Sequence, residues 1–179
     1  MGEKMSNQII AEYAVNCLDE DKLKTFLDFF DFLNKNNFGK VKTGRKVNGS
    51  WAIQYKNKMI GSFVLGKIDG YDRGNSWSIR YFNLFPRNEW FEKCEKYLSV
   101  EMKDFVLSNI NTTSKCCVVE GKCHPVENRI ILGKMFTGKV CSCRPIKLND
   151  PDGKTLEYAK ELALIGKEII TEMTASSIK

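Results

Sequence analysis

The sequence predicts an α+β fold, in which an antiparallel sheet packs against helices and a cysteine-rich segment and a final helix form the C-terminal end. Apolar residues recur with helical spacing near both ends of the chain and alternate with a period of two between them. The chain has 179 residues, of which 42% are hydrophobic and 28% charged, as expected for a single globular domain over residues 1–179. No apolar run approaches the ~18 residues that would cross a bilayer, and no signal peptide precedes the first expected helix. We therefore expect a cytoplasmic protein that does not enter a membrane.

The N-terminal part, residues 7–36, is expected to form two helices. Asp19 can cap the second helix, because its carboxylate can accept a hydrogen bond from a backbone N–H of the first turn. The apolar residues of this helix follow helical spacing and predict a deeply buried face: Leu23, Phe26, Leu27, Phe30 and Leu33.

Residues 50–85 are expected to form three antiparallel strands, after a polar, glycine-punctuated connection over 40–49. Apolar and polar residues alternate in this part, as they do in a strand with one buried face. The aromatic and branched residues that share the expected face are Trp51, Ile53, Tyr55, Trp77, Ile79 and Tyr81.

Two further helices are expected, one long helix over residues 88–109 and the final helix over 150–173. Cys94 lies on the apolar side of the first of these helices, and we interpret it as a packing residue. Asp150 can cap the final helix, and Pro151 suits its first turn. Between these helices lies a cysteine-rich segment, 114–145, with short strands expected at 116–119 and 129–132.

Five of the seven cysteines lie in this segment together with the only histidine, and they form the candidate metal site: Cys116, Cys117, Cys123, Cys141, Cys143 and His124. In a reducing cytosol, such thiols indicate metal binding, catalysis or burial rather than disulfides. Zinc prefers four thiolate or imidazole ligands in a tetrahedron, supplied as local pairs. The first hypothesis is therefore a small zinc-binding protein with a structural site, in which Cys116 and His124 can substitute for one of the other four thiols.

The spacing leaves two other interpretations of the thiols open. Typical structural zinc sites place two to four residues between paired cysteines, whereas five residues separate Cys117 from Cys123 and one separates Cys141 from Cys143. The thiols can instead be buried packing residues, or one of them can be a redox or nucleophilic group activated by neighbouring lysines. Since no C-x-x-C pair or familiar enzyme signature is present, we assign no catalytic residue and do not favour an enzyme.

The C-terminal end resembles that of small uncharacterised Firmicute proteins of clostridial type. The resemblance rests on Gly133-Lys134-Met135-Phe136, on Val140-Cys141, and on an N-P-D-type helix start at Asn149-Asp150-Pro151-Asp152, followed by Thr155-Leu156-Glu157 and Lys160. It covers the last 65 residues, and the chain departs from it by Asp150 before the proline and by the adjacent Cys116 and Cys117. The resemblance implies a compact α+β domain with recurring thiols and implies no reaction.

The aromatic face of the expected sheet supports a second hypothesis. Helices can cover this face and make the core, or part of it can bind a small apolar or aromatic ligand through Trp51, Tyr55, Trp77 and Tyr81. Residues 35–58 are basic and contain no acidic residue, but they match no nucleic-acid recognition motif, and a solvated basic loop explains them. A nucleic-acid partner is not expected, and the sequence does not indicate an oligomeric state.

Overall fold

A computed structural model describes residues 2–42, 49–66, 75–81, 89–112, 126–141 and 145–176, and confirms the α+β fold. The five helices are α1 (Gly2–Cys17), α2 (Glu20–Lys35), α3 (Glu89–Glu95), α4 (Val100–Ser108) and α5 (Gly153–Ser176). The strands of the main sheet are β1 (Gly39–Lys42), β2 (Ser50–Tyr55), β3 (Lys58–Leu65), β4 (Trp77–Tyr81) and β7 (Ile146–Asn149), and the hairpin strands are β5 (Val126–Ile131) and β6 (Lys134–Val140).

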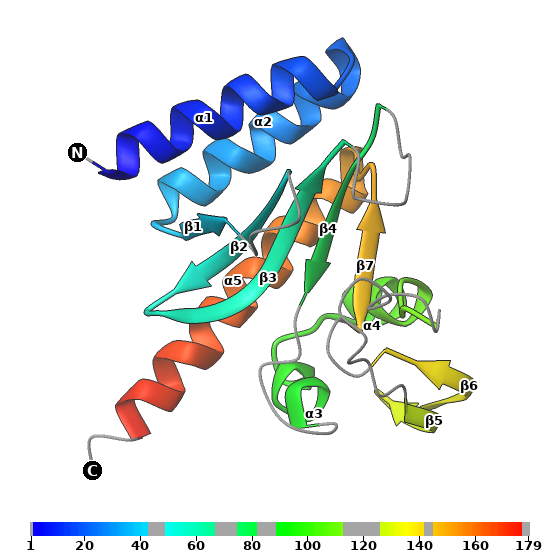
Figure 1. Ribbon diagram of the computed structural model, residues 1–179. Coiled ribbons are helices and arrows are strands. Elements are labelled where there is room, and N and C mark those ends of the chain that lie inside the picture. Colours follow the sequence, from blue (N-terminus) through cyan, green and yellow to red (C-terminus); the bar gives the residue numbers. More distant parts are fainter. Residues whose placement is uncertain are drawn as a thin grey trace.

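The main sheet is antiparallel, with the strand order β1-β2-β3-β4-β7. The β5–β6 hairpin forms a separate two-stranded sheet that lies near α4 (Figure 1). Leu132 and Gly133 make its turn, and both have positive φ angles, of 48° and 76°. A pair of positive φ angles gives a turn whose twist matches that of the flanking strands, and Gly133 adopts such an angle without strain. The strand expected near residues 129–132 is therefore present, and its partner follows directly.

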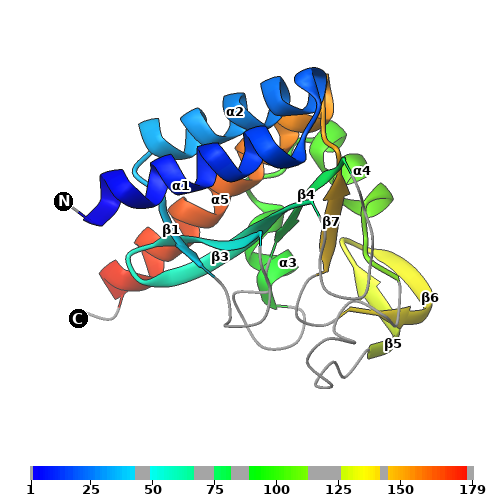
Figure 2. The ribbon, with the colours of Figure 1, turned by 45° about the horizontal axis from the view of Figure 1, so that its top comes forward.

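Helices α1, α2 and α5 lie on one face of the main sheet (Figure 2). On this face, Trp51 of β2 packs edge-on against Tyr13 of α1, with ring centroids 5.4 Å apart. Trp77 of β4 packs in the same way against Phe26 of α2, also at 5.4 Å, and the Tyr81 hydroxyl donates to a backbone carbonyl of α5. The hydrophobic core therefore lies between the three helices and the aromatic face of the sheet.

Close contact between α5 and the sheet requires a glycine. A Cβ atom on Gly166 would lie 2.7 Å from Cγ2 of Ile60 in β3, which is closer than real carbon contacts allow. The small residue at position 166 therefore lets the helix backbone approach the strand.

The second helix begins as expected. The Asp19 carboxylate accepts a hydrogen bond from the backbone N–H of Lys22 at 3.0 Å, and Phe26, Phe29, Phe30 and Leu33 are buried. This bond lowers the pKa of Asp19, because it favours the charged carboxylate.

No helix in the described parts of the chain is long and apolar enough to cross a membrane.

The structure corrects the helix expected over residues 88–109. It is two helices, because α3 ends at Glu95 and α4 begins after Ser99, whose hydroxyl caps the new helix by accepting from the Met102 N–H at 3.2 Å. The apolar spacing continues across the break, and Phe91, Cys94, Leu98 and Met102 are all buried. Apolar spacing alone could not reveal the interruption, whereas the capping serine could.

Two strands that the sequence did not predict complete the main sheet. β1 overlaps the start of the stretch interpreted as a polar connection, and β7 lies just before the final helix. Both are only four residues long, and the β7 sequence Ile146-Lys147-Leu148-Asn149 alternates over only two periods. Such short segments acquire strand structure by pairing with a neighbour, not from their own propensity.

The structure also corrects the expected role of Asp150. Helix α5 begins at Gly153, and the Asp150 carboxylate accepts a hydrogen bond from the backbone N–H of Trp77 at 2.7 Å instead of capping the helix. The backbone N–H of Asp150 donates a second hydrogen bond, of 2.8 Å, to the Trp77 carbonyl. Asp150 thus extends the pairing between β7 and β4 by one residue.

Candidate functional site

Two parts of the chain that flank the predicted thiol cluster meet at one point. The Cys141 N–H donates to the carbonyl of Asn111 at 2.9 Å, and the Asn111 N–H donates to the carbonyl of Pro145 at 2.7 Å. Asn111 lies shortly before the segment that carries Cys116 to His124, and Pro145 follows the segment that carries Cys143. One short ladder of backbone hydrogen bonds therefore joins the flanks of both segments.

The far end of the first segment returns to the same point. Val126 begins β5 and pairs with Val140 at the end of β6, directly before Cys141. The chain thus leaves this point after Asn111 and comes back to it at Val126. Both the entry and the exit of this cysteine-bearing segment lie beside Cys141.

Cys141 is completely buried and lies near a buried cation. The Arg129 side chain of β5 is 3% exposed, and its guanidinium lies 5.6 Å from the centroid of the Phe91 ring. Burial lowers the pKa of Arg129 because it disfavours the charged form, and a negative charge on Cys141 acts in the opposite direction. A thiolate at Cys141 would therefore help to stabilise the guanidinium that is buried near it.

Of the six candidate metal ligands, Cys141 alone lies in the described residues. The other five lie outside them: Cys116, Cys117, Cys123, His124 and Cys143. Within the described ranges, no three side chains of His, Cys, Asp or Glu come together as a possible ligand set. The site residues taken from the sequence thus stay a prediction.

The remaining two cysteines lie on helices α1 and α3. Cys94 of α3 is in the hydrophobic core, as its spacing predicted, and burial raises the pKa of its thiol because the thiolate would lose hydration there. Cys17 is a free, half-buried thiol at the end of α1. The burial of Cys94 argues against an activated nucleophile at that position, because such a thiol needs a nearby cation and access to solvent.

The four residues of the predicted ligand face are engaged in packing. Trp51, Trp77 and Tyr81 are at most 5% exposed and belong to the hydrophobic core. Tyr55 is half-buried, with its ring near that of Phe38 at 6.3 Å. Their positions agree with the interpretation in which helices cover the aromatic face and make the core.

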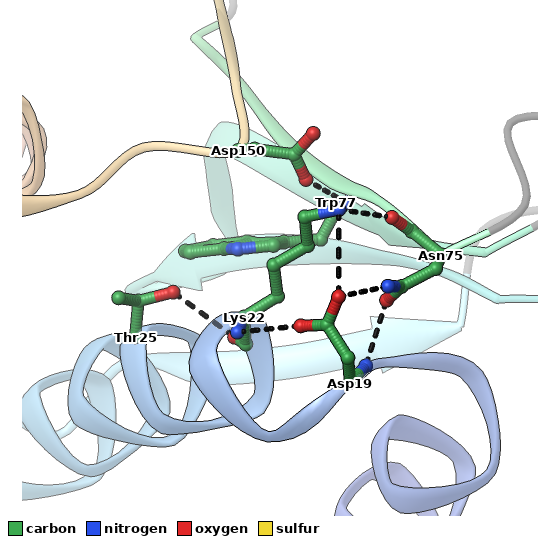
Figure 3. Close-up of polar contacts among 6 residues, drawn as sticks. All are labelled: Asp19, Lys22, Thr25, Asn75, Trp77 and Asp150. Atoms are coloured by element: carbon green, nitrogen blue, oxygen red, sulfur yellow. Dashed lines mark hydrogen bonds and ion pairs between the residues drawn. The ribbon is translucent and has the colours of Figure 1, made fainter.

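The start of β4 is fixed by polar contacts at the top of this face (Figure 3). The Lys22 ammonium donates to the Asn75 carbonyl at 2.6 Å, and the Asn75 side chain exchanges hydrogen bonds with Asp19. Asp150 accepts a hydrogen bond from the backbone N–H of Trp77, the first residue of β4. These contacts join the first turn of α2 to the ends of two strands, and they are satisfied among themselves, which favours a structural role.

Two grooves lie along α2 and α5, with volumes of about 690 and 440 Å³. Charged side chains line most of both grooves, and Lys160 crosses between the helices to pair with Asp28 at 2.8 Å and Glu157 at 2.7 Å. None of the four aromatic residues of the predicted ligand face lines either groove. The grooves therefore give no support to an apolar ligand site.

No protein-family model, no curated protein and no solved structure matches this chain.

Proposed function

We propose that this protein binds a structural zinc ion through Cys117, Cys123, Cys141 and Cys143, with Cys116 and His124 as alternative ligands. The backbone junction at Cys141 supports this proposal, because the described residues that flank both cysteine-bearing segments meet there. In the sequence, Cys123 lies three residues before Val126, and Cys143 lies two residues from both Cys141 and Pro145. An extended chain spans roughly 3.5 Å per residue, so these thiols have short tethers to the junction.

The charge near Cys141 supports the same proposal. Four thiolates around a divalent zinc ion carry an excess of negative charge, which a buried site must compensate. Arg129 is a buried cation in electrostatic contact with Cys141. Lys115, Lys122, Lys139 and Arg144 lie beside the candidate cysteines in the sequence and add further positive charge. These charges suit a thiolate-rich metal site.

The metal would have a structural role. Zinc with four protein ligands leaves no open position for a substrate, and its binding free energy stabilises the folded chain. Thiols bind zinc in their reduced, deprotonated form, which a cytoplasmic location would maintain. The ion would thus join the segments on both sides of the β5–β6 hairpin.

Elemental analysis of the full-length, tag-free protein tests this proposal. We expect about one zinc ion per chain in the wild-type protein and in the Cys94→Ala variant, whose cysteine lies in the hydrophobic core. The Cys141→Ser variant should lose most of the bound zinc and should unfold at a lower temperature. A chelator should lower the unfolding temperature of the wild type to that of this variant.

Two results would contradict the proposal. One is a wild-type protein that is folded and free of metal, and that takes up no added zinc. The other is a Cys141→Ser variant that keeps its full zinc content. The first result would leave burial or thiol chemistry as the role of the cysteines, and the second would remove Cys141 from the ligand set.

A further inference from the structure

The two edges of the main sheet differ in how they are covered. At the β7 edge, Ile146 forms an isolated bridge with Ile110, on the side away from β4. The Lys147 N–H donates to the carbonyl of Asn109 at 3.3 Å. The segment that follows α4 therefore pairs with the outer side of β7.

The opposite edge of the sheet is β1, which pairs with β2 on its inner side (Figure 1). In an antiparallel ladder, alternate residues of a strand direct their backbone N–H and C=O groups away from the partner strand. No strand in the described ranges pairs with β1 on this outer side. The edge therefore presents backbone donors and acceptors with which an extended chain can pair.

Val41, which pairs with Ala52 of β2, gives this edge an exposed apolar side chain. Trp51 and Ile53, on either side of Ala52 in the sequence, belong to the hydrophobic core. Since successive side chains of a strand point to opposite faces, Ala52 and Val41 lie on the second face of the sheet, opposite the aromatic residues. Ala52 is 1% exposed there, whereas Val41 is 48% exposed. A side chain of an added strand can therefore pack against Val41.

Three exposed lysines lie around the start of β1. Lys35 is the last residue of α2, shortly before the strand, and Lys56 and Lys58 lie where β2 turns into β3. This turn follows Gln54, which is the register partner of Gly39 at the start of β1. In the described parts of the chain, none of the three lysines forms an ion pair. Their charges are therefore available to the carboxylates of a partner.

The charge of this region decides which kind of strand can be added. Residues 35–58 carry lysines and arginines and no acidic residue. Lysines at a sheet edge oppose pairing with a second copy of the same strand, because like charges would then face each other. The same charges attract a segment that carries carboxylates. The edge is therefore complementary to an acidic chain and not to itself.

We propose that the β1 edge binds an extended acidic segment of a partner protein, which adds a strand to the main sheet. The backbone of the segment pairs with the outward N–H and C=O groups of β1, and one of its apolar side chains contacts Val41. Its carboxylates lie beside the three lysines at the start of the strand. In this mode, main-chain hydrogen bonds supply affinity and alternate side chains supply specificity. A nucleic acid would use the lysines but not the strand edge.

An NMR titration of the isotope-labelled full chain with a short synthetic peptide, in which glutamate and valine alternate, tests this proposal. We expect saturable shift changes at the backbone amides of Gly39–Lys42 and weaker binding at higher salt. The combined variant Lys35→Glu, Lys56→Glu and Lys58→Glu should lower the affinity by at least about tenfold, because it reverses the charges beside the strand. The matched control Lys24→Glu changes an exposed lysine nearer the start of α2 and should leave the affinity unchanged.

A peptide of the same sequence, methylated on its backbone nitrogens, separates strand addition from simple charge attraction. It keeps the carboxylates but cannot donate hydrogen bonds to β1, so it should bind at least about tenfold more weakly. Equal affinity of the methylated peptide would overturn the proposal, as would the absence of saturable shift changes at β1. A single-stranded oligonucleotide that displaces the peptide at lower concentration would identify a nucleic-acid surface instead, and the proposal would also fail.

Discussion

The two faces of the main sheet have opposite chemistry, although they are built from the same strands. The face under α1, α2 and α5 carries tryptophans, tyrosine and branched residues that pack with the helices. The other face carries Ser50, Ser62, Ser78, Arg80 and Lys147. Residues one step apart in the sequence therefore lie in different surroundings, one apolar and covered by helices, the other containing three buried serines and two half-buried cations.

The comparison also explains why aromatic residues are poor guides to a ligand site in this protein. A large aromatic side chain on a sheet face gains most by burial under a helix, because the apolar area removed from water is large. Small hydroxyl residues gain little from such packing. Where they line a buried sheet face together with cations, burial costs free energy unless hydrogen bonds or counter-charges compensate.

Substitution of the neighbours Trp77 and Ser78 should give the largest difference between the two faces. Trp77→Ala should lower the free energy of unfolding by about 3–5 kcal/mol, because it leaves a cavity against Phe26 and Phe29. Ser78→Ala should change it by less than about 1 kcal/mol, since no hydrogen bond is lost. Urea unfolding measures both values. Equal losses for the two variants would show that the second face is packed as tightly as the first.

Two glycine-to-alanine substitutions should have smaller effects, one where the new Cβ atom has a close contact and one where it has room. Gly166→Ala should cost about 1–3 kcal/mol, because the new Cβ would meet Ile60 at 2.7 Å on the helix-covered face. Gly39→Ala in β1 places its Cβ at an ordinary 3.7 Å from Gln54, and the lower entropy of its unfolded chain should stabilise the protein by about 0.4–1 kcal/mol. Urea midpoints of the two variants would shift in opposite directions. A shift in the same direction would mean that α5 can move away from β3 at little cost.

The stability of the protein at alkaline pH should depend on the burial of the Cys94 thiol in the hydrophobic core. Burial raises the pKa of Cys94 above its usual 9.0, so above about pH 9 the unfolded chain loses this proton while the folded chain keeps it. The unfolded state then binds fewer protons, and the free energy of unfolding falls with rising pH, by about 1.4 kcal/mol per pH unit. Below pH 8 this contribution is fully present and independent of pH.

Urea unfolding between pH 8 and pH 10 measures this slope. Cys94→Ala should remove most of it, whereas Ser62→Ala on the second face should keep it, because no ionisable group is lost. An unchanged slope in Cys94→Ala would place the alkaline loss elsewhere, for example at Tyr81, whose pKa burial also raises.

The sequence predicted the elements whose local signals are strong. Phe26, Phe30 and Leu33 follow helical spacing and are buried in α2, and the alternation around Trp51 and Trp77 identified two strands. The break at Ser99 was missed because the apolar positions continue across it. The two short strands were missed because four residues carry too little pattern to outweigh a loop.

For the residues outside the aromatic core, too, the sequence predicted some features and missed others. The clustering of thiols in the sequence predicted a metal site, and the one candidate ligand in the described residues, Cys141, lies where the flanks of two cysteine-bearing segments meet. The pairing of Arg80 with Lys147 had no counterpart in the sequence, because 66 positions separate these residues and the strand that carries Lys147 was not predicted. The alternation of Trp77, Ser78, Ile79, Arg80 and Tyr81 does assign Arg80 to the face opposite the aromatic residues.

By itself, the sequence determined the fold class, the helix and strand periods and the separation of apolar from polar faces. These properties depend on residues that are close in the chain, where backbone geometry alone fixes the direction of each side chain. The tertiary structure decided which strands are neighbours, that Asn111 meets Cys141 and that Arg80 faces Lys147. Such pairings follow from the packing of the whole core, because a short strand finds its partner only when the rest of the sheet is in position.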